Sequence, residues 1–224
     1  IRAANNILEK SNQVLQSGVS QSDIDPFLGE ARFFRAMAYF SLFQRYCGVP
    51  LILKTLVETD PELYSAQASR DEVLTAIYAD LDFAASVLPL PSAINVKEYG
   101  KVSKTAAWAL KARVALFEGT RAKFHGYGNA TNHLTLARDA ALNVINSTQH
   151  SLYSSYYKLF QIEGDGPSNK ENILVRIYGA NESDRIIWSD VQRQLEQGAA
   201  SPTKALADAY LMTDGLPTDK SPNY

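Results

Sequence analysis

The residues best suited to chemistry in this chain are a few aromatic side chains with polar neighbours. Trp188 has Asp184, Arg185, Ser189 and Asp190 close by in the sequence, outside any long helical pattern. A flat exposed ring stacks on the face of a sugar, while neighbouring polar groups hydrogen-bond its hydroxyls. The pattern predicts a saccharide contact at Trp188, with plain packing of the indole as the alternative.

Two further stretches carry the same combination of ring and amide. Tyr178 is followed by Asn181 just past Gly179, and Tyr127 lies in a glycine-rich stretch with Asn129. Their chemistry would be recognition alone, stacking plus hydrogen bonds without a covalent step. The candidate ligand-binding residues are therefore Trp188, Tyr178, Asn181 and Tyr127.

The residue types that carry catalysis do not form a recognisable constellation. His125, His133 and His150 lack the spacing of metal ligands. Asp80 and Asp82 are two residues apart and fall on different faces of a helix, so they cannot work as a carboxylate pair. Neither a nucleophile elbow nor a phosphate-binding loop is present. We therefore predict that the protein is not an enzyme and binds no cofactor or metal. A hydrolase would need a carboxylate pair, which this sequence does not show.

The composition indicates a globular protein without a nucleic-acid partner. Of 224 residues 46% are hydrophobic, and the net charge is only −2, which lacks the basic footprint of nucleic-acid binding. The single cysteine, Cys47, excludes an internal disulfide and a cysteine metal site, and we expect it to be a small buried residue. Since Ile1 is not Met and opens inside a helical pattern, we expect a piece of a longer protein.

Hydrophobic periodicity predicts helices over 1–17, 23–46, 69–88, 103–119 and 132–147. Ser69 and Glu72 form a capping-box pattern, and Gly119 is expected to end or break the fourth helix. The buried stripe of the second helix is predicted to be Phe27, Ala31, Phe34, Ala38 and Leu42.

Arg32 and Arg35 lie on the second predicted helix, among its aromatic residues. A partly buried arginine normally finds a carboxylate. We favour an ion pair with Asp25, Glu30 or another helix; the alternative is a grip on a sugar hydroxyl or a partner's carboxylate.

The long helical periodicity of the sequence ends after residue 150. Alternating β-branched residues predict a strand over 172–178, and 186–188 could be a second strand or a loop. Short helices are expected within 152–160 and over 202–210, and a turn over 213–217. We therefore predict two regions, a helical one over 1–150 and a loop-rich one with a little β structure over 151–224.

The four later helices suggest two antiparallel pairs, 23–46 with 69–88 and 103–119 with 132–147. Tetratricopeptide units are such pairs with small residues at the contact, but they repeat at about 34 residues. Here the connections are longer. The pattern predicts an irregular tetratricopeptide-like array, curved, of the kind that serves as a binding scaffold.

Several motifs, in one consistent order, carry a family resemblance. They are Arg2-x-x-Asn5 with Ile7 and Leu8; Gly29-Glu30-Ala31-Arg32-Phe33-x-Arg35-Ala36 through Tyr39-Phe40 to Gly48-Val49-Pro50-Leu51; the run from Lys101 to Ala115 with Glu118-Gly119-Thr120 and Phe124-His125; Asn169-Lys170-Glu171; and Pro202-Thr203, Leu206, Asp208-Ala209-Tyr210 and Asp214-Gly215-x-Pro217. With these motifs the chain resembles the SusD/RagB family of glycan-binding outer-membrane lipoproteins of Bacteroidetes.

The resemblance implies a function and a location. It implies a surface lipoprotein that captures oligosaccharides or polysaccharides, in some members peptides, and hands them to a SusC-like TonB-dependent transporter. Family members are longer, so the resemblance covers the central tetratricopeptide portion, truncated at both ends, and the membrane is reached only through a lipid anchor absent from this chain. The alternative is that these helices dock the transporter, with the ligand site in missing segments.

Overall fold

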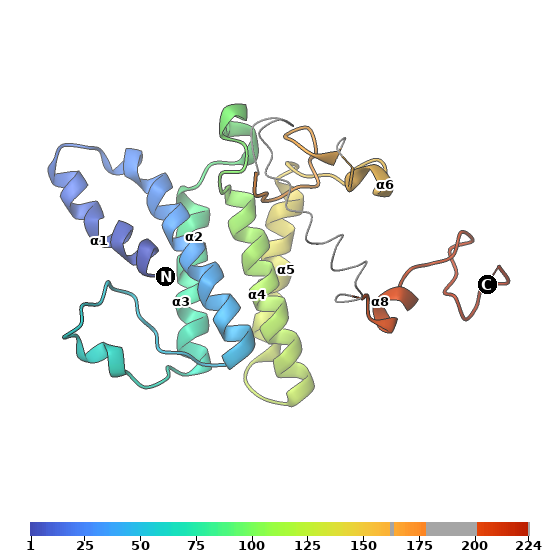
Figure 1. Ribbon diagram of the computed structural model, residues 1–224, viewed down its shortest axis with the longest axis horizontal. Coiled ribbons are helices and arrows are strands. Elements are labelled where there is room, and N and C mark those ends of the chain that lie inside the picture. The colour runs from blue at the N-terminus through green and yellow to red at the C-terminus, as the bar shows by residue number, and fades with distance from the viewer. Residues whose placement is uncertain (162–163, 178–200, 224) are drawn as a thin grey trace. The chain divides into compact units, whose positions relative to one another are not determined.

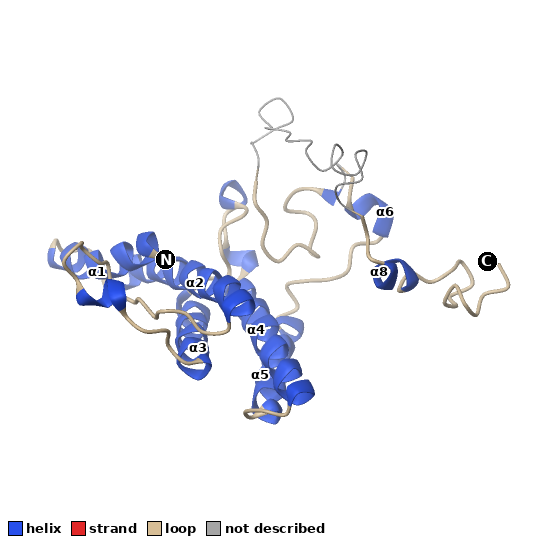
Figure 2. Cartoon of the chain, turned by 60° about the horizontal axis from the view of Figure 1, so that its bottom comes forward, coloured by secondary structure: helices blue, strands red, loops and turns tan. Residues whose placement is uncertain are grey.

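The chain is described by a computed structural model at residues 1–161, 164–177 and 201–223. It divides into two compact units, Ile1–Arg176 and Ile177–Tyr224. The described residues form helices and loops without a strand (Figure 2), so the predicted mainly α class is confirmed. The division predicted at residue 150 stays a prediction. Within the described ranges, no helix has the length and apolarity needed to cross a bilayer.

The first unit is built on a row of long helices. These are α1 (Arg2–Gln16), α2 (Gln21–Tyr46), α3 (Arg70–Val87), α4 (Lys104–His125) and α5 (Ala130–Asn146). The short elements are η1 (Pro61–Tyr64), η2 (Pro91–Ala93), η3 (Val96–Glu98), α6 (Tyr156–Leu159) and, in the second unit, α8 (Lys204–Asp208). Each long helix packs against the next one in the chain (Figure 1). Both predicted helix pairs are therefore confirmed, as α2 with α3 and α4 with α5.

The helix ends follow local capping chemistry. The Ser69 side chain accepts from the Glu72 amide, and the Glu72 carboxylate accepts from the Ser69 amide at 2.7 Å, which confirms the capping box. The expected end at Gly119 is wrong, because α4 continues to His125 and ends at left-handed Gly126. Gly119 instead lets α5 approach: an added Cβ would lie 2.8 Å from Cγ of Leu134.

The aromatic residues of α2 fill the core, but not along the predicted stripe. Phe33, Tyr39 and Phe43 are each at most 2% exposed, whereas Phe27 is 60% and Phe34 46% exposed. The predicted stripe is wrong at Phe27 and Phe34, because α2 carries aromatic residues on both faces, whereas its Ala31 is buried as predicted. Its buried face also holds a charged residue, Arg35, which a hydropathy pattern places outside.

A buried ion pair explains that arginine. Nε and Nη2 of Arg35 each donate to Asp80 of α3 at 2.7 Å, and Nη1 donates to Oδ1 of Asn5 in α1 at 2.9 Å. Asn5 donates in turn to the carbonyls of Ile52 and Lys54. One network thus ties α1, α2, α3 and the segment after α2 together. The favoured prediction for Arg35, an ion pair with another helix, is confirmed.

Two further expectations are wrong. Cys47 is half-buried at the C-terminal cap of α2, with a positive φ of 68°, so it is not a packed core residue. Residues 172–177 form no strand, since the alternating side chains there have no neighbouring strand for a ladder. Residue 178 and the second possible strand at 186–188 lie outside the described residues.

The second unit confirms its predicted local features. A turn over 213–217 closes with the amide of Gly215 donating to the carbonyl of Met212 at 2.8 Å. Asp214 caps it: its carboxylate accepts from the Ser221 hydroxyl and the Leu216 amide, and these bonds lower the pKa of Asp214.

Candidate functional site

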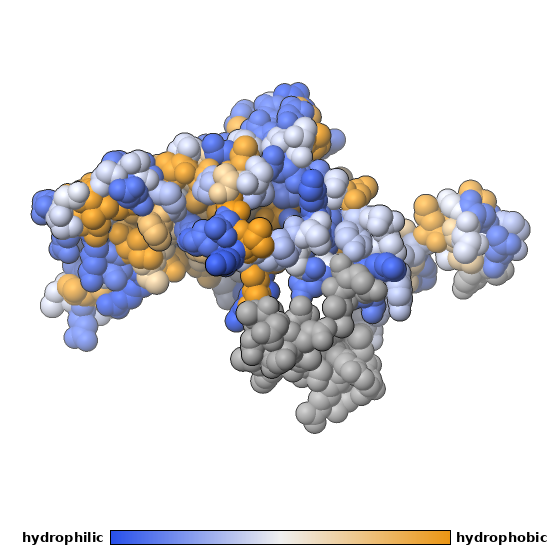
Figure 3. Space-filling model, turned by 90° about the horizontal axis from the view of Figure 1, so that it is seen from above, coloured by the Kyte–Doolittle hydropathy of each residue, from blue (hydrophilic) through white to orange (hydrophobic). Residues whose placement is uncertain are grey.

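A pocket of about 350 Å³ lies in the first unit, at the end of the helix row where α4 begins. Three segments distant in sequence line it, namely residues 91–103, 148–150 and 167–175. Figure 3 views the molecule from above and shows hydrophilic and apolar residues interspersed over its surface. A pocket of this size and mixed lining suits a small polar ligand.

The first lining segment is a chain of caps and turns. Asn95 begins η3, with its Oδ1 accepting from the Lys97 amide at 2.9 Å. Gly100 follows at φ 97°, a left-handed conformation that glycine adopts without strain. The Ser103 side chain then accepts from the Ala106 amide and starts α4. These local bonds fix the backbone that carries Tyr99 into the pocket lining.

The second segment is held by His150. Its Nδ1 donates to the carbonyl of Lys170 at 3.0 Å, and its Nε2 lies 2.8 Å from the Thr105 hydroxyl. The neighbouring Gln149 accepts from the Ser92 amide at 3.0 Å. His150 therefore works as a brace between α4 and the third lining segment, and both its ring nitrogens are engaged.

The third segment is shaped by the motif at 169–171. Asn169 is 2% exposed, donates to the carbonyl of Gly164 at 2.7 Å and accepts from the Glu171 amide at 2.9 Å. The Glu171 carboxylate accepts from the Tyr153 amide at 2.7 Å. This motif, which is one of those that carry the family resemblance, therefore holds the backbone of the pocket wall in place through hydrogen bonds.

The polar and aromatic groups that line the pocket include the ring of Tyr99, the amide of Asn172 and the ammonium groups of Lys101 and Lys170. The Asn172 amide donates to the Tyr99 hydroxyl at 3.3 Å, which places a ring beside a polar group. Lys101 and Lys170 line the pocket without a carboxylate among its described lining residues. Lys101 pairs outside it with Glu98 at 2.6 Å, and this hydrogen bond raises the pKa of Lys101. Stacking and hydrogen bonding to hydroxyls are therefore the chemistry this pocket offers.

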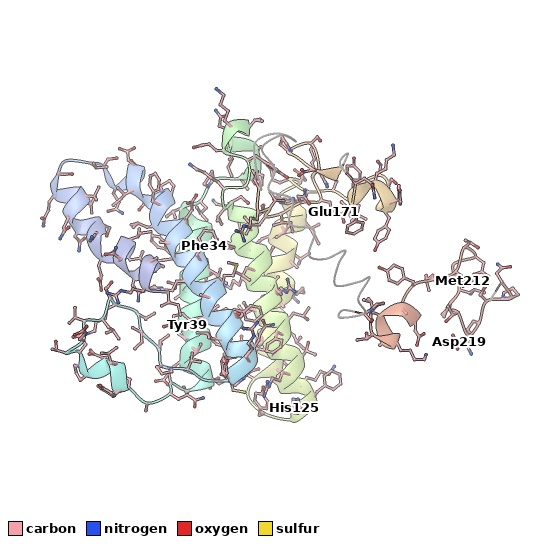
Figure 4. The ribbon with its side chains drawn as sticks, viewed as in Figure 1. Phe34, Tyr39, His125, Glu171, Met212 and Asp219 are labelled. Carbon is pink, nitrogen blue, oxygen red and sulfur yellow. The ribbon has the colours of Figure 1, made fainter. Side chains whose placement is uncertain are left out.

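Of the predicted ligand-binding residues, Tyr127 lies among the described residues, and it does not line this pocket. Trp188, Tyr178 and Asn181 lie outside the described residues. Tyr127 lies beyond the far end of α4, whose 22 residues span about 33 Å; Figure 4 labels His125 at that end. The ring of Tyr127 is half-buried and stacks on His125, with centroids 6.4 Å apart.

Sequence reasoning missed Tyr99, Asn172 and the bracing His150. Tyr99 and Asn172 are 73 residues apart, and no periodic pattern joins a turn to a distant loop. The only local signals were the capping residues and the motif at 169–171. Among the described residues, no group of three histidine, cysteine or acidic side chains is placed to hold a metal ion.

Comparison with known proteins assigns the chain to a family. A SusD-like family model, described as starch-binding and associating with the outer membrane, matches residues 1–116. The chain therefore belongs to the SusD-like family, and the resemblance found in the sequence is confirmed. A SusD-like protein of Bacteroides ovatus is 25% identical over 175 residues, which cover 78% of this chain and 30% of that protein.

Solved structures agree on the fold. A SusD-like protein of Bacteroides fragilis superposes with a TM-score of 0.72 at 24% identity, over 96% of this chain and 40% of that chain. A laminarin-binding SusD-like protein superposes with a TM-score of 0.55 at 26% identity, over 75% of this chain and 34% of that one. The chain thus spans less than half the length of each of these relatives.

Proposed function

We propose that this chain is the helical part of a non-catalytic protein that captures oligosaccharides at the bacterial outer membrane. Membership in a family described as starch-binding supports the ligand class and the location. The observation that carries the proposal is the pocket beside α4, where Tyr99 and Asn172 place a ring next to hydrogen-bonding groups. The captured glycan would then pass to a SusC-like TonB-dependent transporter, with a lipid anchor holding the whole protein at the cell surface.

Replacing Tyr99 with alanine is expected to weaken oligosaccharide binding at least about tenfold, which corresponds to about 1.4 kcal/mol. The reason is the loss of a stacking face together with the hydroxyl that Asn172 contacts. Isothermal titration of the chain with malto-, laminari- and xylogluco-oligosaccharides measures the effect.

Tyr64→Ala is the matched control, since Tyr64 ends η1 and is 90% exposed outside the pocket lining. Equal binding by both variants would refute the pocket as the site. Trp188→Ala tests the predicted contact at Trp188: if it alone abolishes binding, the site lies there and not at Tyr99. Release of product from any glycan would contradict a non-catalytic role.

A second candidate function is docking of the transporter by the helices themselves. An exposed apolar stripe on α2 favours it, with Phe27 60%, Phe34 46% and Met37 41% exposed. Exposed apolar residues grouped on one face mark interaction surfaces more often than chance exposure does.

The double variant Phe27→Ser, Phe34→Ser is expected to lower co-purification with a co-expressed SusC-like transporter at least about tenfold, because two large apolar side chains leave the interface. Undiminished co-purification, with oligosaccharide binding also retained, would count against docking through α2. The exposed pair Lys204→Ala, Asp208→Ala on α8 serves as the control.

A further inference from the structure

A second cluster of functional groups lies at the far end of α4, away from the saccharide pocket. There the end of α2, the start of α3 and the end of α4 meet, contributing Cys47, Arg70, Glu118 and Arg121, with Tyr127 from the following loop. Nε of Arg70 donates to both carboxylate oxygens of Glu118, at 3.1 and 3.2 Å. The Glu118 side chain is only 3% exposed and that of Arg70 is 17% exposed.

The charges in this cluster do not balance. Nε and Nη2 of Arg70 both donate to the carboxylate of Glu118. Nη2 of Arg121 donates to the thiol sulfur of Cys47 at 3.4 Å, and sulfur is a weak acceptor. The cluster thus holds two guanidinium groups and one carboxylate, which leaves an excess of one positive charge among these described residues.

Three buried donors in the cluster lack an acceptor. They are Nη1 of Arg70, Nε of Arg121 and the hydroxyl of Tyr127. Buried polar groups are nearly always hydrogen-bonded, and an exception calls for a bound ion or water. Three such exceptions within one cluster, two of them on cations, indicate a missing acceptor with negative charge.

The contacts around Arg70 place Tyr127 beside it. Its Cζ lies 4.0 Å from the Phe43 ring centroid and 5.9 Å from that of Tyr127. Burial lowers the pKa of Arg70, but the hydrogen bond to Glu118 and the charge of Glu118 outweigh burial, so the pKa of Arg70 is raised. Arg70 therefore stays charged, with Cys47 and Tyr127 both within electrostatic reach.

The loop over the cluster keeps it close to solvent. Tyr127 lies between Gly126 at φ 68° and Gly128 at φ 61°, conformations that favour glycine on both sides. Both glycines are exposed. A small ligand would therefore approach the cluster from the side of Tyr127.

We propose that Arg70, Arg121 and Tyr127 bind a carboxylate. A carboxylate carries the single charge that balances the excess, and its oxygens accept charge-assisted hydrogen bonds from the two free guanidinium donors, Nη1 of Arg70 and Nε of Arg121. The Tyr127 hydroxyl supplies a third donor. The carboxylate could come from a small free acid or from a sugar acid. The proposal is independent of the saccharide pocket, whose neutral oligosaccharides need neither arginine.

Titration with sodium acetate and sodium glucuronate at constant ionic strength, set with sodium chloride, tests this site. The readouts are the amide resonances of Tyr127 and Gly128 in the ¹⁵N-labelled chain and the melting temperature. Saturable shifts and a rise in melting temperature are expected. Tighter binding of glucuronate would assign the site to a sugar acid, and equal binding would assign it to the carboxylate alone.

Arg121→Gln is expected to weaken the apparent affinity at least about tenfold, and Tyr127→Phe, which keeps the ring, to weaken it several-fold. Arg113→Gln is the matched control, because Arg113 is an exposed arginine of α4 outside the cluster. Absence of saturable shifts overturns the proposal, as does an unchanged affinity in both Arg121→Gln and Tyr127→Phe. If Arg121→Gln does not fold, Tyr127→Phe decides alone.

Discussion

Replacing Asp80 by asparagine is expected to lower the free energy of unfolding by about 3–5 kcal/mol, the usual cost of removing one partner from a buried ion pair. Asp80 accepts two hydrogen bonds from Arg35 at 2.7 Å, and the side chains of Asp80 and Arg35 are only 5% and 8% exposed. Nη1 of Arg32 lies 3.8 Å from the same carboxylate. Asparagine would leave the Arg35 charge buried without its counter-ion.

Urea unfolding followed by circular dichroism measures this loss. Asp82→Asn is the matched control, since Asp82 pairs with Lys111 but its side chain is 58% exposed. Solvent-exposed pairs contribute at most about 1 kcal/mol, so the control should stay within that range. A loss below about 1 kcal/mol for Asp80→Asn would show that the network around Arg35 does not hold α1, α2 and α3 together.

Phe43→Ala is expected to lower the free energy of unfolding by about 3–5 kcal/mol, the range for removing a buried phenylalanine. Phe43 is 0% exposed. Its ring meets Phe117 of α4 edge to face, with centroids 6.3 Å apart, and carries the Arg70 guanidinium on its face. The substitution therefore removes contacts to α3 and α4 at once and leaves a cavity between them.

Phe34→Ala on the same helix provides the comparison. Phe34 is 46% exposed and touches Phe33 edge to face at a centroid distance of 5.4 Å. Its removal should cost about 1 kcal/mol or less, because half of its surface already faces water. The same unfolding measurement applies. A larger loss of unfolding free energy for Phe34→Ala than for Phe43→Ala would support the buried stripe predicted from the sequence and contradict a core built on Phe43.

Local signals allowed the helices and several of their ends to be predicted. The capping box of Ser69 and Glu72 involves residues only three apart, so the hydrogen bonds that start α3 can be predicted from a short stretch of sequence. Gly119 shows the limit of such signals. Glycine both ends helices and permits close packing, and only the position of Leu134 in α5 decides between the two.

The buried face of α2 could not be found from hydropathy. Phe27 and Phe34 are as apolar as Phe33 and Phe43, yet they face solvent. Arg35 is buried because Asp80 of α3 and Asn5 of α1 meet it, and both partners are at least 30 positions away. Tertiary pairing therefore overrides the periodic pattern at this helix.

The position of the pocket was even harder to predict from the sequence than the buried face of α2. Residues 172–177 of the strand predicted over 172–178 form a loop, and Asn172 hydrogen-bonds to Tyr99. No sequence pattern links that loop to η3. Their contact depends on the hydrogen bond of His150 to the Lys170 carbonyl and on that of Asn169 to the Gly164 carbonyl. Ring-and-amide chemistry was expected, but at other positions.

Mapping of a bound oligosaccharide by amide chemical shifts decides whether the pocket beside α4 binds the saccharide. The ¹⁵N-labelled chain is titrated with the oligosaccharide that binds best in calorimetry. The account predicts saturable shifts in residues 91–103, 148–150 and 167–175, which line the pocket, and their loss in Tyr99→Ala. Saturable shifts that leave these three segments unchanged, or no shifts with any oligosaccharide, would contradict it.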